Sequence, residues 1–222
     1  PTCLILVGPP GVGKTETCKG VFKALENLVP DGGIAWKRLD MNEYSESHSA
    51  ARLIGSPPGY VGHGEPSELD GIQDNPYSIV LFDEIDKAHP DVFSKTLMNA
   101  MENGEIVSAS GGAGKRIDCR RCFFLFTSNA KETEIIAALE QRNAYASQDR
   151  VDAICQRIYN RSGLSRPLID RIMHFIPFRP LPPTIMAEVT TLGVCAVAAE
   201  YDLEIVRIEP SIISEILNSV DE

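Results

Sequence analysis

The sequence predicts an α/β protein with three layers, built on a parallel five-stranded sheet and followed by a small helical unit. Five short apolar runs recur along the 222 residues with little alternation, which is typical of strands buried on both faces. Longer segments with helical spacing separate the runs, and this order indicates parallel strands joined by right-handed crossovers. The predicted strands are 3–7, 34–39, 79–82, 122–126 and 173–176.

The segments between and after these runs carry helix signals. Residues 14–28 place Val21 and Leu25 on one helix face. Residues 90–103 are apolar at helical spacing until Gly104 ends the pattern. Further helices are predicted at 150–159, 184–201 and near 212–219, and the Gly-, Ser- and Ala-rich stretch 108–114 is predicted to be a flexible connector.

A change of composition marks a domain boundary. Three prolines fall within 179–183, and the chain beyond them is Ala-rich and helical in pattern. We therefore expect a large domain at 1–178 and a small one at 179–222. The chain starts without Met, directly on an apolar run, so we expect no signal peptide and interpret it as a piece of a longer protein.

The composition narrows the function classes. A net charge of −10 argues against a general nucleic-acid binder, and no apolar run is long enough to predict a membrane span. Six cysteines include a lone C-x-x-C at Cys119 and Cys122. Because no second pair or spaced histidines follow, structural thiols are expected there rather than a zinc or redox site. This cysteine usage suits a reducing cytoplasm.

A phosphate-binding loop follows the first predicted strand. The segment GPPGVGKT fits G-x-x-x-x-G-K-[ST] with a strand before it and a helix after it. Glycines let backbone N–H groups curl around phosphate oxygens, Lys14 reaches the outer phosphates, and Thr15 offers a hydroxyl to Mg²⁺. The alternative is a Gly-rich turn without ligand. The predicted ATP- and Mg²⁺-binding residues are Gly8, Pro9, Pro10, Gly11, Val12, Gly13, Lys14, Thr15, Glu16 and Asp83.

Acidic and amide side chains follow the third and fourth predicted strands. In IVLFDE, Asp83 is placed to hold Mg²⁺ and Glu84 to polarise an attacking water, which indicates hydrolysis as well as binding. The alternative is that Asp83, Glu84 or Asp86 caps a helix. Asn129, in FLFTSN, would lie beside the γ-phosphate and orient the water, although Asn after a strand is often a turn residue.

The chain resembles the second ATPase module of the Clp/heat-shock unfoldases, the ClpA, ClpB and ClpV group of AAA+ proteins. Four long segments carry the resemblance, and SRPLIDRI matches more loosely. The resemblance implies a P-loop NTPase fold, with a Walker A segment at 8–15, Walker B carboxylates at Asp83 and Glu84, and sensor-1 at Asn129. The long segments are GPPGVGKTET, LDMNEYSESHSAARLIGSPPGYVG, NPYSIVLFDEIDKAHPDVF and FLFTSNA.

The resemblance also implies roles that the residues alone do not. Arg171 falls where the family places an arginine finger, which reaches the nucleotide of the neighbouring subunit and so implies a homo-oligomeric, hexameric ring. The sequence GYVG corresponds to a pore loop in which Tyr60 and Val61 grip a polypeptide substrate, the alternative being that Tyr60 packs on the core. The predicted pore-loop residues are Gly59, Tyr60, Val61 and Gly62.

The chain departs from the family pattern in three places. Asp74 and Asn75 stand where arginines are common in the family. Before the finger, the family has Phe-Arg-Pro-Glu, whereas residues 165–168 of this chain are Ser-Arg-Pro-Leu. Residues 179–222 correspond to only part of the family's C-terminal lid, without its sensor-2 arginine. We expect this piece to bind nucleotide weakly and hydrolyse it slowly.

Several functions are compatible with this pattern. Residues 130–165 contain no Ile-Gly-Leu or Ile-Gly-Phe tripeptide, so docking to a ClpP-type protease is not expected. A ClpB-like disaggregase and a ClpV-like ATPase that disassembles the type VI secretion sheath both stay open. A nucleotide-gated scaffold without turnover, or a nucleic-acid motor, is less favoured because Glu84, Arg171 and Tyr60 are present.

Overall fold

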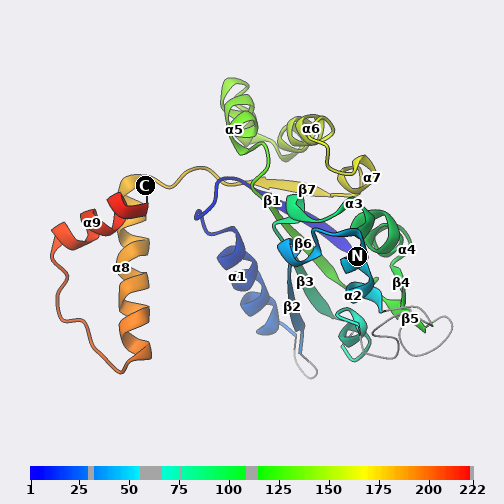
Figure 1. The fold of residues 1–222 in the computed structure, drawn as a ribbon. Helices are drawn as coiled ribbons and strands as arrows, with labels where there is room; N and C mark the ends of the chain where they lie inside the picture. The colour runs from blue at the N-terminus through cyan, green and yellow to red at the C-terminus, as the bar shows by residue number, and fades with distance from the viewer. Residues whose placement is uncertain (30–32, 56–66, 76, 109–114, 221–222) are drawn as a thin grey trace. The chain divides into compact units, whose positions relative to one another are not determined.

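A computed structural model describes residues 1–29, 33–55, 67–75, 77–108 and 115–220. The chain divides into two compact units, Pro1–Arg179 and Pro180–Glu222, which are described separately (Figure 1). Within the described ranges, no helix combines the length and the apolarity needed to cross a membrane.

The first unit contains the predicted parallel five-stranded sheet, so the expected α/β fold class is confirmed. Its strands lie in the order β2-β3-β6-β1-β7, and every neighbouring pair is parallel. Each predicted apolar run overlaps one of them. The strands are β1 (Thr2–Val7), β2 (Ala35–Asp40), β3 (Ser78–Asp83), β6 (Phe123–Ser128) and β7 (His174–Pro177).

Helices cover both faces of this sheet and make three layers (Figure 1). On one face, Leu6, Leu81 and Leu125 pack with Cys18 of α1 (Lys14–Glu26). Neighbouring strand residues point the other way, toward the larger core, because side chains alternate along a strand. The helices of this unit are α1, α2 (Ala50–Ile54), α3 (Pro90–Val92), α4 (Met98–Asn103), α5 (Glu132–Gln141), α6 (Gln148–Tyr159) and α7 (Arg166–Ile169).

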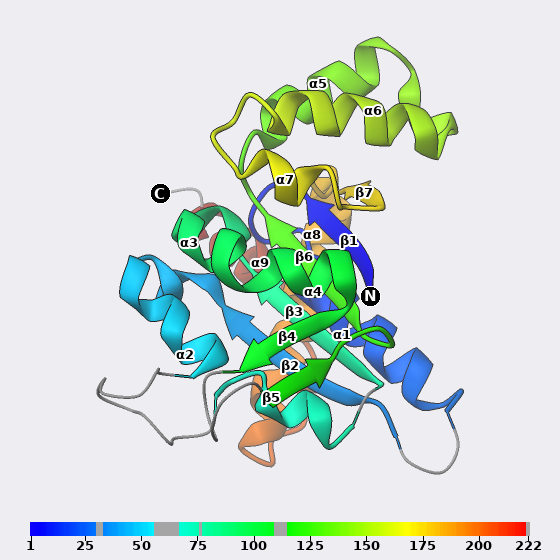
Figure 2. The same cartoon turned by 90° about the vertical axis from the view of Figure 1, so that its right-hand side faces the viewer.

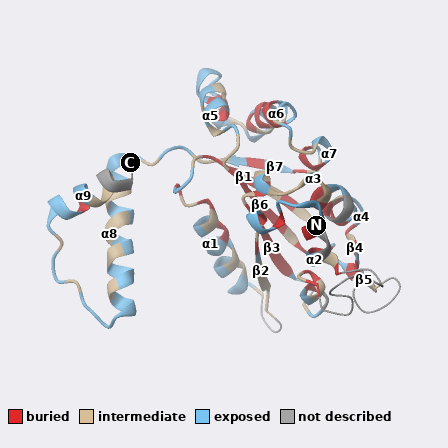
Figure 3. Ribbon diagram, viewed as in Figure 1, coloured by how far each residue is buried: buried red, intermediate tan, exposed pale blue. Residues whose placement is uncertain are grey.

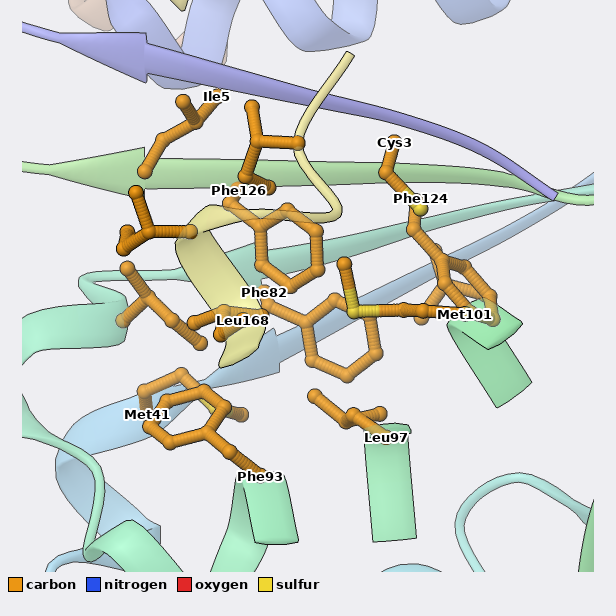
Figure 4. Close-up of a cluster of buried hydrophobic side chains, with 14 of the residues drawn as sticks. Cys3, Ile5, Met41, Phe82, Phe93, Leu97, Met101, Phe124, Phe126 and Leu168 are labelled. Atoms are coloured by element: carbon orange, nitrogen blue, oxygen red, sulfur yellow. The ribbon is translucent and has the colours of Figure 1, made fainter. Parts of the chain in front are cut away.

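Aromatic rings fill the larger core. The rings of Phe82 and Phe126 stack with their centroids 5.1 Å apart, and Phe124 meets Phe82 edge-on at 5.6 Å. Leu97 and Met101 close the cluster from the helical layer (Figure 4). Such ring pairs add stability beyond their buried area.

The structure differs from the predicted elements in several places. The helix predicted at 90–103 is interrupted by a π-helical segment, Phe93–Leu97, before Gly104 ends it in a left-handed conformation (φ 72°). Helix α5 was not predicted. Nor was the antiparallel hairpin of β4 (Glu105–Ser108) and β5 (Lys115–Asp118), which lies near α4 (Figure 2). Of the predicted connector 108–114, Ser108 belongs to β4 and the rest lies outside the described residues.

The second unit consists of two helices, as the sequence predicts. They are α8 (Pro183–Glu200) and α9 (Pro210–Val220), and they pack on one another. Helix α8 is strongly apolar, yet none of its residues is buried (Figure 3). A helix that is apolar all round is normally buried, so this unit presents an unusually apolar surface.

Replacing Phe82 by Ala should lower the free energy of unfolding by about 3–5 kcal/mol, because the side chain is fully buried between two aromatic rings. Urea unfolding measures the change. Leu28→Ala is the control: its side chain is 73% exposed, and its effect should stay within about 0.5 kcal/mol. Equal losses from the two variants would contradict the proposed core.

Candidate functional site

The candidate site lies at the carboxyl edge of three adjacent strands. Strands β3, β6 and β1 run parallel, so their last residues, Asp83, Ser128 and Val7, reach the same edge of the sheet. Ligands of open α/β sheets bind at this edge. β2 lies beside β3 and pairs Asp40 with Asp83, which brings a fourth strand end to the site.

The loop after β1 has the conformation that its glycines allow. Gly13 is the N-cap of α1 and has a φ of 90°, a left-handed backbone conformation that residues other than glycine rarely adopt. A Cβ atom on Gly8 would lie 2.5 Å from the carbonyl oxygen of Phe178, so only glycine fits there. The first N–H groups of α1 have no partner within the helix and can bind an anion.

Lys14 is held inside this loop. The residue is 8% exposed, and Nζ donates to the carbonyl oxygens of Gly8 (2.7 Å) and Pro9 (2.5 Å) and to Oδ1 of Asn129 (2.6 Å). Burial lowers the pKa of Lys14 below its ordinary value, against the raising effect of Asp83 and Glu84. All three donors of the ammonium are used, so a phosphate must replace at least one of these acceptors.

Asp83 is a nearly buried carboxylate with three side-chain partners. Its residue is 4% exposed, and Oδ1 accepts from Thr127 at 2.5 Å and from Thr15 at 3.1 Å. Oδ2 accepts from Nε of Arg38 at 2.9 Å, and Nη2 of the same guanidinium lies 2.7 Å away. Asp83 and Thr15, both predicted as magnesium ligands, are therefore in direct contact.

Glu84 is positioned by its backbone and by two amides. Its φ of 58° and ψ of 53° are left-handed, and its N–H donates to Oγ1 of Thr127 at 2.9 Å. Oε2 accepts from Asn42 at 2.7 Å, and Oε1 accepts from Asn129 at 3.1 Å. Asn129 thus links the two charged residues: its amide oxygen accepts a hydrogen bond from Lys14, and its amide nitrogen donates one to Glu84.

The acidic residues after β3 do not cap a helix. Glu84 occupies the N-cap position of the short 3₁₀ turn Ile85–Lys87, but its side chain makes no cap hydrogen bond. Oδ1 of Asp86 instead accepts from Oγ of Ser128 at 2.8 Å and from the backbone N–H of Asn129 at 3.2 Å. Asp86 therefore fixes the end of β6, and with it the position of Asn129.

The phosphate loop, the start of α1 and the carboxyl ends of β2, β3 and β6 line one cleft of about 460 Å³. Of the predicted cofactor and catalytic residues, the cleft contains Pro10, Gly11, Gly13, Lys14, Thr15, Glu16, Asp83, Glu84 and Asn129. Gly8, Pro9 and Val12 belong to the same loop without lining the cleft. The sequence analysis missed Arg38, Asp40 and Thr127, which complete the lining.

A signal for the missed residues was present. Arg38 and Asp40 end β2, so the rule that selected Asp83 and Asn129, polar residues at the carboxyl end of a strand, selects them as well. Asp40 lies within the segment LDMNEY, and Arg38 directly precedes that segment. Thr127 is the penultimate residue of β6 and lies two residues before Asn129, so the same rule extends to it.

Two predicted features lie away from the cleft or outside the described chain. Nη2 of Arg171 lies 3.0 Å from Glu102, and its Nη1 donates to the carbonyl oxygen of Pro167 at 2.9 Å. Arg171 is not among the residues that line the cleft. Residues Gly59, Tyr60, Val61 and Gly62 lie outside the described residues.

The donor set suits a magnesium ion that shares its ligands with a phosphate. Magnesium binds through one or two carboxylates, with waters and substrate phosphates completing the shell. Asp83 and Thr15 supply a carboxylate and a hydroxyl, and the phosphate loop lies beside them. Among the residues that the structure describes, no group of three His, Cys, Asp or Glu side chains could hold a metal by itself.

Comparisons with known proteins agree with this architecture. Residues 2–173 match the family model of the AAA domain (Cdc48 subfamily). The chain is 37% identical over 193 residues to the chaperone protein ClpB of Nitratidesulfovibrio vulgaris, covering 85% of this chain and 21% of that protein. It is 40% identical over 172 residues to ClpB of Rhizobium meliloti, covering 77% and 19%.

A solved structure extends the comparison. A closed-state cryo-EM reconstruction of Hsp104 with ATPγS and FITC casein aligns with 90% of this chain and 32% of its own, at a TM-score of 0.67 and 28% identity. The chain belongs to the AAA+ family, within its Clp/ClpB group, which confirms the resemblance found in the sequence. It spans about a fifth of the length of the curated relatives it matches.

The cysteines are free thiols, and most are out of reach of solvent. Five are buried and Cys195 is exposed. Burial raises the pKa of Cys3 to about 11 and of Cys18 and Cys155 to about 12. In the buried C-x-x-C, the hydrogen bond with Cys122 raises the pKa of Cys119, with burial adding to the effect.

We expect one fast-reacting thiol in the native protein. At pH 8, an aromatic disulfide reagent should modify Cys195 rapidly and the five buried cysteines only when the chain unfolds, because a buried sulfur is shielded from the reagent. Cys195→Ser should remove the fast phase, whereas Cys155→Ser should leave it intact. A second fast thiol that survives Cys195→Ser would show that a buried cysteine is more accessible than the structure indicates.

Proposed function

We propose that this chain is an ATP-hydrolysing motor module of a ClpB-like chaperone, which remodels or threads polypeptides. The observation that carries the proposal is the convergence of Lys14, Asp83, Glu84 and Asn129 on one cleft beside the phosphate loop. A binding site alone would need only the loop and Lys14. The added carboxylate and amide supply what hydrolysis requires.

The proposed binding step uses the loop and α1. Backbone N–H groups and the helix N-terminus receive the phosphates, and Lys14 exchanges carbonyl acceptors for phosphate oxygens. Thr15 and Asp83 would hold Mg²⁺, which supplies positive charge to the β- and γ-phosphate oxygens. The family of this chain supports nucleotide binding as the general function.

The proposed hydrolytic step uses Glu84 and Asn129. Glu84 accepts a proton from the attacking water, and Asn129 keeps that carboxylate in a fixed orientation. Asn42 holds the second carboxylate oxygen, so the group cannot rotate freely. Because each carboxylate oxygen has two lone pairs, the two amides orient Glu84 without using up its capacity to accept a proton.

Hydrolysis would be completed by Arg171 of a neighbouring copy in a hexameric ring. Arg171 lies apart from the cleft of its own chain, as a residue acting in a neighbouring subunit must. Its ion pair with Glu102 is partly exposed, so it is weak enough to be released. A guanidinium stabilises the charge on the transferring phosphoryl group.

The relatives support the proposed polypeptide substrate and chaperone role. The reported relatives carry the name ClpB, and the aligned Hsp104 reconstruction contains ATPγS and casein. We propose that residues 59–62 form the substrate-gripping pore loop and residues 179–222 part of a lid. A ClpV-like role stays the alternative prediction, as do the cytoplasmic location and the absence of protease docking.

Lys14→Ala should weaken ATP binding at least tenfold, because the buried ammonium is the loop's charged phosphate contact. Glu84→Gln should keep ATP affinity within about threefold and lower phosphate release by about 10²-fold or more, because Gln cannot accept the proton. Fluorescent nucleotide titration and a phosphate assay separate the two effects. Lys23→Ala, exposed on the same helix, is the control. Unchanged affinity in Lys14→Ala would reject the site.

Specific ATPase activity should rise with protein concentration, because the finger comes from a second copy. Arg171→Ala should lower activity by about 10³-fold or more and leave ATP affinity unchanged. Arg166→Ala, exposed on α7, is the matched control and should keep the activity. Activity that is independent of concentration and of Arg171 would refute the action between subunits.

A further inference from the structure

Arg38 contacts the carboxylate that the proposed function assigns to the metal. It lies on β2, two residues before the strand ends, and pairs with Leu81 of β3. Its side chain runs along the edge toward the end of β3, where Nε and Nη2 both meet Oδ2 of Asp83, at 2.9 and 2.7 Å. Its side chain is 48% exposed and lines the cleft.

The Arg38 pair compensates a charge that burial would otherwise make costly. Asp83 is 4% exposed, and a buried carboxylate without a compensating charge is strongly destabilising. Thr15 and Thr127 contribute hydrogen bonds to Asp83 but no charge. The guanidinium is therefore the charged partner that Asp83 contacts in this structure.

A divalent cation bound at Asp83 would pair with the same carboxylate charge that Arg38 now neutralises. Two positive charges a few ångströms apart in a partly buried cleft repel each other, and both would draw on the one carboxylate. The Asp83 residue is enclosed, whereas the Arg38 side chain is half exposed and long enough to move. Of the two side chains, the guanidinium of Arg38 is therefore the one that can move away without disturbing the sheet.

We propose that Arg38 is a positioning residue that exchanges with the divalent cation at Asp83. It holds the carboxylate in place, beside Thr15, while the cation is absent, and it releases the carboxylate when the cation binds. Wild-type cation affinity is then lowered by competition from the guanidinium. This inference rests on the proposed function, because it takes Asp83 as the cation's ligand.

The test measures Mn²⁺ affinity by electron paramagnetic resonance, in the presence of saturating ADP. Arg38→Gln should bind Mn²⁺ about tenfold more tightly than the wild type, because the competitor is gone. Arg38→Lys, which keeps the charge but loses the planar fork, should lie between the two. Arg120→Gln is the matched control, since Arg120 makes a two-point pair with Asp118 on the surface. Its Mn²⁺ affinity should equal that of the wild type.

Two results would overturn the exchange. Equal or weaker Mn²⁺ binding in Arg38→Gln would show that the guanidinium does not compete for Asp83. A loss of ADP affinity that is the same in EDTA and in Mn²⁺ would make Arg38 a phosphate contact instead. If neither ADP nor Mn²⁺ binds the wild type, the proposed function and this inference fail together. If both bind and Arg38→Gln changes nothing, only the inference fails.

A measurement on the wild-type chain covers the case in which Arg38→Gln does not fold. The Nε–H resonance of Arg38, assigned through Arg38→Lys, should exchange slowly with solvent because it donates to Asp83. Saturating Mg²⁺ and ADP should shift this resonance and speed its exchange, while ADP in EDTA should not. The Arg120 resonance serves as the reference. A resonance that stays slow in Mg²⁺ and ADP would overturn the proposal.

Discussion

The charge of the nearly buried Asp83 carboxylate is the constraint on which the site depends. The carboxylate lies at the end of a fully buried strand, β3. It accepts hydrogen bonds from Thr15 of the phosphate loop and Thr127 of β6, and it forms an ion pair with Arg38 of β2. Removing such a charge's partner costs more than the pair itself contributes. Three segments distant in the sequence are therefore tied to one side chain, and the cleft keeps its shape around it.

Asn129 connects Lys14, the proposed phosphate contact, to Glu84, the proposed proton acceptor. Its amide oxygen accepts from Lys14 and its amide nitrogen donates to Glu84, so the two charged groups share one rigid link. Asp86 fixes the backbone of Asn129, and Thr127 joins Asp83 to the backbone of Glu84. A change at the lysine on phosphate binding would thus reach the carboxylate through a single side chain. The left-handed backbone of Glu84 is the kind of local strain that such surroundings can hold in place.

The first unit was largely predictable because its signals are local. The strands of the sheet are apolar runs buried on both faces, and the phosphate loop is a contiguous pattern with its strand and helix attached. The predictions were wrong or incomplete where the pattern was short or mixed. The strands β4 and β5 mix charged and apolar side chains over four residues, so they lack the apolar run that predicted the equally short β7. The π-helical turn at Phe93–Leu97 keeps nearly helical spacing.

The sequence by itself determined which side chains belong to the phosphate loop, Lys14 and Thr15, and which stand at the strand ends, Asp83, Glu84 and Asn129; all five line the cleft. Only the tertiary structure decided their partners, because partners depend on which strands are neighbours. The order β2-β3-β6-β1-β7 inserts β6 between β3 and β1 and sets β2 beside β3. That arrangement brings Arg38 to Asp83 and Asn42 to Glu84, across 45 and 42 positions of the chain. Contacts of that separation arise from the packing of the whole sheet, and no local pattern of residues specifies them.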